Sequence, residues 1–341
     1  MPALVSKVKG RILFYGGTLL VLAFSVLYAT SMPGASFEGE LPPSTPQLRE
    51  LATRLREHVA VLAGTIGIRD TARPEQLNAA RDYIESTLRA LAAQPGQLQR
   101  EDVGPAGEHA QNVIFEVPAS VPPSIRPHYI VVVGAHYDSI DTGPGANDNG
   151  SGVAATLELA SAFAKAPAAS RIRFVFFANE EPPFFQNPGM GSLVNAEHAR
   201  QRSDPISAML SLETIGHYSD TPYSQHYPWP VGLLYPNRGN FLGFVGDLGS
   251  RSLVRSAIAT FRDAEQFPSQ GAALPTTFPG VDWSDHWAFR KAGYPAIMLT
   301  DTALFRDSNY HRASDTPEKL DYERLARVTR GIQAVVRELA Q

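Results

Sequence analysis

Histidine and carboxylate residues stand at several points of the chain where they could bind metal ions together. The sequence contains no cysteine, so a metal would have to be held by imidazole and carboxylate groups. Such a ligand set is typical of a hydrolytic metal site rather than a structural zinc site. Each residue alone would more often be a turn residue, a solvated charge or a surface histidine. The candidate ligands are His136, Asp148, Glu181, Glu213 and His311.

Two short motifs join a candidate ligand to a second polar residue. His136 and Asp138 lie one residue apart, so in an extended chain both side chains point to the same side. Asp138 can then accept the proton on the second ring nitrogen and fix the direction of the imidazole. Glu180 and Glu181 are adjacent, and their mutual repulsion calls for a nearby cation. One of the two can bind a metal while the other carries a proton.

The elements that would position these residues alternate between strands and helices. Apolar runs typical of strands buried on both faces precede His136, Glu181 and Glu213. Asp148 lies in a glycine-rich turn before a helix, and His311 lies in a loop before the last helix. This order predicts a three-layer α/β/α sandwich with a mixed, mostly parallel central sheet. In such sheets polar chemistry gathers beyond the carboxyl ends of the strands, where we expect the ligands to meet.

The predicted elements and segments cover most of the chain. Strands are predicted at 113–115, 129–133, 171–178, 206–212 and 296–299. Helices are predicted at 48–62, 73–93, 153–166, 191–200, 249–264 and 322–340. We expect three parts, namely an N-terminal membrane segment (1–31), a linker (32–46) and one catalytic domain (47–341).

Composition narrows the class of protein. Hydrophobic residues make up 43% and charged residues 19% of the chain, which suits a globular core. The net charge is −4 and no long basic run follows the N-terminus, so the charge pattern does not indicate a nucleic-acid-binding protein.

The N-terminal segment resembles a membrane anchor. Lys7, Lys9 and Arg11 precede an uncharged stretch at 12–31, and about 20 apolar residues can cross a bilayer as a helix. The positive flank is expected to stay in the cytoplasm, which puts the catalytic domain outside. The alternatives are a cleaved signal peptide, whose apolar region is normally about 7–15 residues, and a buried core helix.

Six short stretches contain the candidate ligands and their polar neighbours. They are Gly134-Ala135-His136-Tyr137-Asp138, Gly145-Ala146-Asn147-Asp148-Asn149-Gly150-Ser151-Gly152, Ala178-Asn179-Glu180-Glu181, Leu212-Glu213-Thr214-Ile215-Gly216, Ser284-Asp285-His286 and Tyr310-His311. Together they resemble the M28 family of zinc peptidases. The resemblance covers roughly residues 110–340. This family includes co-catalytic aminopeptidases, glutaminyl cyclases and the ectodomains of glutamate carboxypeptidases.

The resemblance implies a role for each metal ligand. Asp148 would bridge two zinc ions, with His136 and Glu213 completing one site. Glu181 and His311 would complete the other site. The family more often has Asp at the position that Glu213 occupies in this chain, so a single-zinc enzyme, with this site empty, is an alternative.

The resemblance also implies a general base and a residue that orients a ligand. Glu180 would take the proton from a zinc-activated water and pass it to the leaving amine. Asp138 would orient His136. Two cations would lower the pKa of the water and polarise the scissile carbonyl.

Four further polar residues are candidates for the substrate pocket. Asp285 and His286 match a family stretch near the pocket, although Ser284 could simply cap a helix there. Tyr235 and His217 are candidates for stabilising the oxyanion, on location alone.

An irregular segment at 218–240, together with 266–283, is expected to form the wall of the pocket. Its aromatic residues predict a preference for apolar substrate side chains. They are Tyr223, Tyr227, Trp229, Tyr235 and Phe241.

Three functions fit these observations. The favoured one is a metal-dependent exopeptidase, an aminopeptidase, acting on peptides or small aminoacyl substrates. The second is a glutaminyl cyclase-type acyltransferase, which needs one zinc ion and in which the substrate's own amine attacks. The third is a non-catalytic binding ectodomain, since a fold alone does not establish function. Retention of every ligand position favours catalysis.

Overall fold

The structure is a computed structural model that describes residues 2–92, 97–104, 110–122, 124–125 and 129–341. Its strands form one sheet in the order β1-β2-β4-β3-β5-β8-β6-β7. Strands β4, β3, β5 and β8 run parallel, while β1, β2 and β6 each have an antiparallel neighbour. The strands are β1 (Leu98–Asp102), β2 (Gln111–Val117), β3 (Ile130–His136), β4 (Arg171–Phe177), β5 (Ile206–Glu213), β6 (Leu242–Asp247), β7 (Ser269–Leu274) and β8 (Ala296–Thr300). The predicted mixed, mostly parallel α/β fold is confirmed.

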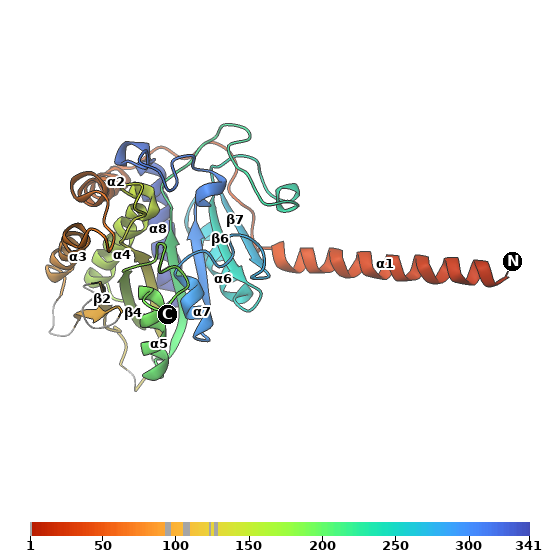
Figure 1. Ribbon diagram of the computed structural model, residues 1–341, viewed down its shortest axis with the longest axis horizontal. Helices are drawn as coiled ribbons and strands as arrows, with labels where there is room; N and C mark the ends of the chain where they lie inside the picture. Colours follow the sequence, from red (N-terminus) through yellow and green to blue (C-terminus); the bar gives the residue numbers. More distant parts are fainter. Residues whose placement is uncertain (1, 93–96, 105–109, 123, 126–128) are drawn as a thin grey trace.

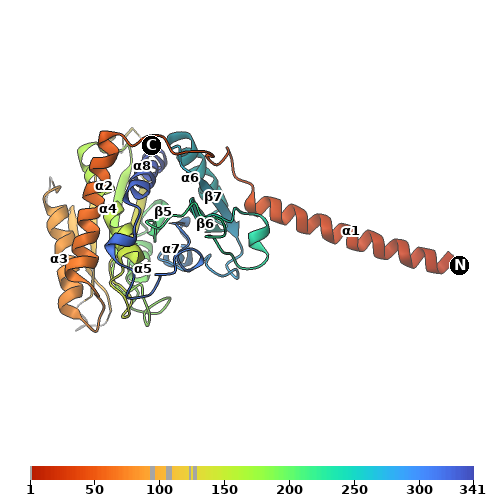
Figure 2. The ribbon, with the colours of Figure 1, turned by 90° about the horizontal axis from the view of Figure 1, so that it is seen from above.

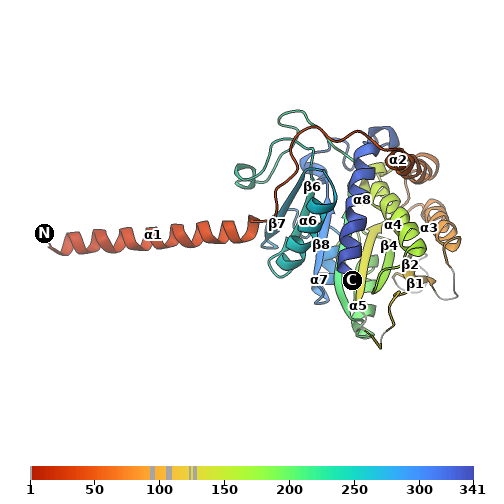
Figure 3. The same ribbon diagram turned by 180° about the vertical axis from the view of Figure 1, so that it is seen from behind.

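Helices cover both faces of this sheet (Figures 1 and 3). A large apolar core joins one face to α2, α3, α4, α6 and α8, and a smaller core joins the other face to α5 and α7. The helices are α2 (Pro46–Val59), α3 (Pro74–Arg89), α4 (Gly152–Lys165), α5 (Gly191–Gln201), α6 (Arg251–Ala264), α7 (His286–Lys291) and α8 (Tyr322–Leu339). The result is the expected arrangement of three layers.

Strand β3 lies at the point where the chain changes direction across the sheet. The next strand, β4, pairs on one side of β3, and β5 pairs on the other. Every residue of β3 is buried, as expected for a strand covered on both faces. A Cβ at Gly134 would lie 2.3 Å from the ring of Phe177, so the close packing of β3 on β4 requires glycine. The carboxyl ends of the three strands therefore meet at one edge, where ligands bind in open α/β sheets.

The N-terminal segment forms helix α1 (Pro2–Thr30), which projects away from the sheet (Figure 2). The prediction that this segment crosses a membrane is not supported by the structure. Among the residues whose placement is described, no helix has both the length and the apolar character that a membrane span requires.

The segment after α1, predicted to be a linker, lies against α6 and β7. Arg262 Nη1 donates to the backbone oxygens of Pro33, at 2.8 Å, and of Gly34, at 3.0 Å. The backbone N–H of Ser269 donates to Ser36 Oγ at 3.0 Å. The start of this segment is thus hydrogen-bonded to the domain.

Most predicted elements are present with ends shifted by a few residues. The helix predicted at 73–93 ends at Arg89, and its predicted last residue, Ala93, lies outside the described residues. Strands β1, β6 and β7 were not predicted, and of the short helix α7 only a possible start near Ser284 was anticipated. Strand β7 belongs to the region expected to form the pocket wall, whereas β6 lies outside it.

Candidate metal centre

The five candidate ligands come together in two groups that share Asp148. In the first group, His136 Nε2 lies 3.3 Å from Asp148 Oδ1 and 3.4 Å from Glu213 Oε2. In the second group, His311 Nε2 lies 3.0 Å from Asp148 Oδ2 and 3.3 Å from Glu181 Oε2. Each group could hold one metal ion, and each uses a different oxygen of Asp148.

These distances fit ligand atoms around zinc. Zinc bonds to nitrogen and oxygen are about 2.0–2.1 Å long, so neighbouring ligand atoms of a tetrahedral site lie about 3.3 Å apart. Asp148 Oδ2 and His311 Nε2 are buried and close, yet neither has a well-aligned hydrogen-bond partner among the described residues. Their lone pairs suit a shared cation better than a hydrogen bond between them.

The ligands owe their positions to the ends of the central strands. His136 is the last residue of β3 and Glu213 is the last residue of β5. Glu181 follows β4 after a short turn. Because these strands are neighbours in the sheet, residues far apart in the sequence meet at one edge.

Asp148 is held by a turn that two distant residues fix in place. The Asp315 carboxylate accepts the backbone N–H groups of Asn147, at 2.8 Å, and of Asp148, at 3.1 Å. Arg69 is fully buried and donates to the backbone oxygen of Gly145 at 2.9 Å. Neither Arg69 nor Asp315 was identified as a site residue from the sequence. The nearness of Asp315 to His311 in the sequence was the only available signal.

Asp138 organises the centre through its carboxylate and its backbone. Asp138 Oδ1 and Oδ2 accept the backbone N–H groups of Glu180 and Glu181, each at 3.1 Å. His136 Nδ1 lies 3.2 Å from the backbone oxygen of Asp138 and 3.5 Å from Oδ1. Asp138 therefore positions the candidate base and one ligand as well as the imidazole it was expected to orient.

The buried carboxylates of the cluster need positive charge nearby, from protonated histidines or from metal ions. Burial raises the pKa of Glu180 well above its usual value, and burial with the charge of Asp148 raises the pKa of Glu181 to about 7. Burial opposes ionisation of Asp148, but His136 and His311 outweigh it and lower the pKa of that carboxyl. Burial acts to lower the pKa of His311, yet its carboxylate partners raise it to about 10. Bound metal ions would supply the positive charge that protonated imidazoles otherwise provide.

Glu213, the residue that departs from the family pattern, has its own support. Ser284 Oγ donates to Glu213 Oε2 at 2.8 Å, and Ser284 Oγ lies 2.9 Å from Ser211 Oγ. Asn149 Nδ2 approaches the same carboxylate oxygen at 3.5 Å. These contacts direct the longer side chain toward His136.

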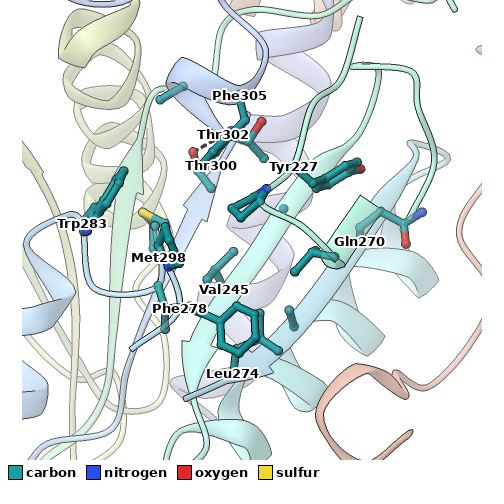
Figure 4. A pocket seen from close by; sticks show the side chains of 18 of the residues that line it. Tyr227, Val245, Gln270, Leu274, Phe278, Trp283, Met298, Thr300, Thr302 and Phe305 are labelled. Atoms are coloured by element: carbon teal, nitrogen blue, oxygen red, sulfur yellow. Dashed lines mark hydrogen bonds between the residues drawn. The ribbon is translucent and has the colours of Figure 1, made fainter. Parts of the chain in front are cut away.

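An apolar pocket opens beside the first ligand group (Figure 4). Its volume is about 920 Å³ including the open mouth. Among the described residues that line it, Glu213 is the only charged one and also belongs to the first ligand group. Tyr310, the neighbour of the ligand His311, lines the pocket as well. Of the predicted aromatic wall, Tyr227, Tyr235 and Phe241 line the pocket.

Two other predicted wall residues do not line this pocket. Tyr223 and Trp229 are 75% and 87% exposed. They belong to the surface of the irregular segment, close in sequence to the pocket but outside it. The segment therefore contributes some, but not all, of its aromatic residues to the pocket wall.

Asp285 and His286, predicted near the pocket, are not among the residues that line it. Both are fully buried, and His286 Nε2 lies 2.7 Å from the backbone oxygen of Val281. Burial raises the pKa of Asp285 to about 7 and lowers the pKa of His286 to about 4. A neutral His286 is thus part of the packing around the loop that carries Ser284.

The two oxyanion candidates have other partners. Tyr235 lines the pocket, but its hydroxyl donates to the backbone oxygen of Gly271 at 2.8 Å. His217 Nδ1 faces Asp307 Oδ1 at 3.7 Å. Tyr310, in contrast, is stacked on His311 with ring centroids 3.9 Å apart. Its position beside the ligands makes Tyr310 the better-placed phenol.

Comparison with known proteins assigns the chain to one protein family. The model of "Peptidase family M28" matches residues 112–336. The uncharacterized protein YfbL of Escherichia coli is 33% identical over 326 residues, covering 92% of this chain and 97% of its own length. An aminopeptidase of Pseudomonas aeruginosa is 36% identical over 177 residues, which cover 46% of this chain and only 30% of that protein.

Solved structures share the fold at low identity. LapB of Legionella pneumophila superposes with a TM-score of 0.67 and 18% identity, covering 93% of this chain and 81% of its own. A glutaminyl cyclase of Porphyromonas gingivalis superposes with a TM-score of 0.60 and 18% identity, covering 84% and 98%. The family match, together with the arrangement of the ligands, identifies the chain as a member of peptidase family M28 and a zinc-dependent metallopeptidase.

Proposed function

We propose that the protein is an aminopeptidase that uses two zinc ions, bridged by Asp148. The observation that carries this proposal is that two ligand groups meet on separate oxygens of one carboxylate. When bound, two zinc ions would lower the pKa of a water molecule and polarise the scissile carbonyl. His136 and Glu213 would hold one ion, and Glu181 and His311 the other.

Glu180 is the residue we propose as general base. Its Oε2 lies 4.0 Å from His136 Nε2, beside the ligands but in neither ligand group. Burial favours its protonated form, so the carboxylate would readily take a proton from the attacking water. The same proton can then pass to the leaving amine. Asp138 would hold the base in place through the backbone N–H of Glu180.

The apolar pocket would hold the side chain on the acyl side of the cleaved bond. Its inner end contacts the metal centre at Glu213 and Tyr310. Burial raises the pKa of Tyr310, so its hydroxyl stays protonated and could donate to the substrate carbonyl oxygen. We therefore propose a preference for large apolar N-terminal residues.

Hydrolysis of aminoacyl p-nitroanilides tests this function. The zinc-loaded chain should release p-nitroaniline from leucine and phenylalanine substrates faster than from glutamate or lysine ones. Chelation should abolish the activity, and Glu180→Gln should reduce it by roughly 100-fold or more while zinc stays bound. A panel that favours charged residues would contradict the assignment of the apolar pocket.

A glutaminyl cyclase-type acyltransferase is the second candidate. The presence of Glu213 in place of the usual Asp favours it, because such an enzyme would need only one zinc ion. Cyclisation of N-terminal glutamine with one zinc per chain and no hydrolysis would establish this alternative. Absence of both reactions and of bound metal would leave a binding ectodomain.

We also propose, from the sequence alone, that the catalytic domain lies outside the cytoplasm. The basic residues before the uncharged stretch 12–31 are the support for this placement. Cell fractionation that separates cytoplasmic from extracytoplasmic proteins tests it. Recovery of the full-length chain in the soluble cytoplasmic fraction would contradict it.

A further inference from the structure

A second cleft reaches the metal centre from the other ligand group. It lies between residues 70–72 and 182–184, with a volume of about 500 Å³ including its open mouth. Glu181 lines this cleft, whereas Glu213 lines the apolar pocket. Because these two carboxylates belong to different ligand groups, each cavity reaches the centre at a different group.

The cleft is acidic where the pocket is apolar. Four carboxylates line it, and no lysine or arginine does among the described residues. Asp138 and Glu181 are engaged in the metal centre, which leaves Asp70 and Asp141. Asp70 Oδ2 pairs with Arg73 at 2.5 Å, but its Oδ1 has no hydrogen-bond partner in the described part of the chain. Asp141 is exposed at the mouth.

A buried asparagine in the same cleft is a second, independent indication that the cleft binds a ligand. Asn179 lines the cleft and is only 1% exposed. Its side-chain oxygen Oδ1 has no hydrogen-bond partner among the described residues, although buried polar atoms normally have one. A carbonyl oxygen that faces a cavity can accept a hydrogen bond from an ammonium or guanidinium group.

We propose that this cleft is the subsite for the residue that follows the cleaved bond, and that it selects lysine or arginine there. The inference rests on the proposed peptidase function. With the acyl-side side chain in the apolar pocket, the substrate would cross the metal centre toward Glu181, and the next side chain would enter the cleft. Asp70 and Asp141 would attract its positive charge, and Asn179 would accept a hydrogen bond from it.

Dipeptide amides of equal length test the subsite. The zinc-loaded full chain would be assayed with Leu-Lys-NH₂, Leu-norleucine-NH₂ and Leu-Glu-NH₂. A partly exposed ion pair contributes up to roughly fivefold in an equilibrium, so kcat/KM should favour lysine over norleucine by about fivefold, with glutamate lowest. Asp141→Asn and Asp70→Asn should each lower the lysine-to-norleucine ratio. The exposed Asp263 lies on α6 away from the cleft, so Asp263→Asn should keep the ratio of the unchanged protein.

The outcomes separate the subsite from the function. Cleavage of leucine p-nitroanilide together with a lysine-to-norleucine ratio near one would overturn the subsite and leave the peptidase intact. The same fall of the ratio in Asp263→Asn as in Asp141→Asn would also overturn it, because net charge alone would then explain the preference. No cleavage of the anilide would overturn the proposed function, and the subsite with it.

Discussion

The two ligand groups around Asp148 are held in different ways. His136 and Glu213 end buried strands and are 1% and 6% exposed. His311 comes from a loop, has a left-handed backbone (φ 58°) and has a side chain that is 33% exposed. The first group is thus part of the sheet edge, while the second takes its histidine from a more exposed loop. We expect the second group to exchange its metal faster than the first.

Loss of the shared ligand should have the largest effect. Asp148→Ala removes one ligand from each group, so we expect less than one zinc per chain and a loss of activity of roughly three orders of magnitude or more. Zinc content and anilide hydrolysis measure this. Asp263→Ala serves as the matched control on α6 and should keep both. Full activity in Asp148→Ala would show that the two groups do not share this residue.

Removing the loop histidine should affect one group only. His311→Ala should keep the zinc of the first group, lose that of the second and lower kcat by roughly 100-fold. The same zinc count and a competition assay with a chelator can follow this. If His311→Ala lost both zinc ions together, the two ligand groups would not bind metal independently, and the proposed difference between them would be wrong.

The support of Glu213 can be tested at Ser284. Ser284→Ala removes the hydrogen bond to Glu213 Oε2, and such outer contacts contribute roughly 10-fold or more to metal affinity. We expect about tenfold weaker zinc binding at the first group and little change at the second. The exposed Ser86 on α3 offers Ser86→Ala as a control. Equal weakening at both groups would argue against a specific contact.

The pH dependence of zinc binding tests the protonation states of the second group. Zinc must displace a proton from His311 below a pKa of about 10, and from Glu181 below a pKa of about 7. Zinc affinity of the second group should therefore fall as pH falls, with a steeper slope below about pH 7. Zinc titrations between pH 5.5 and 8.5 measure this slope. A constant affinity across that range would contradict the protonation states inferred for this group.

Much of the fold followed from the apolar runs of the central strands. The buried β-branched residues of β3 and the aromatic residues of β4 have no good alternative to a covered parallel sheet. Strands β6 and β7 escaped prediction because glycine and small residues interrupt their apolar pattern. A Cβ at Gly271 would lie 2.9 Å from Met32, a packing reason for glycine that local sequence does not reveal.

The candidate site also contains residues that the sequence predicted and residues that it did not. The ligands were predictable because each carries its own chemistry and follows a recognisable strand or turn. Arg69 and Asp315 were not, since they act through contacts with residues 76 and 168 positions away. Asp315 also had a sufficient local explanation as a helix-start residue. Long-range hydrogen bonds of this kind leave no periodic signal.

The zinc stoichiometry of the purified chain tests the central claim most directly. Metal content by mass spectrometry, combined with anomalous scattering from crystals at the zinc edge, would count and place the ions. We predict two zinc ions per chain, one on each oxygen of Asp148. A single ion beside Glu181 and His311, with His136 and Glu213 free of metal, would contradict the two-zinc account.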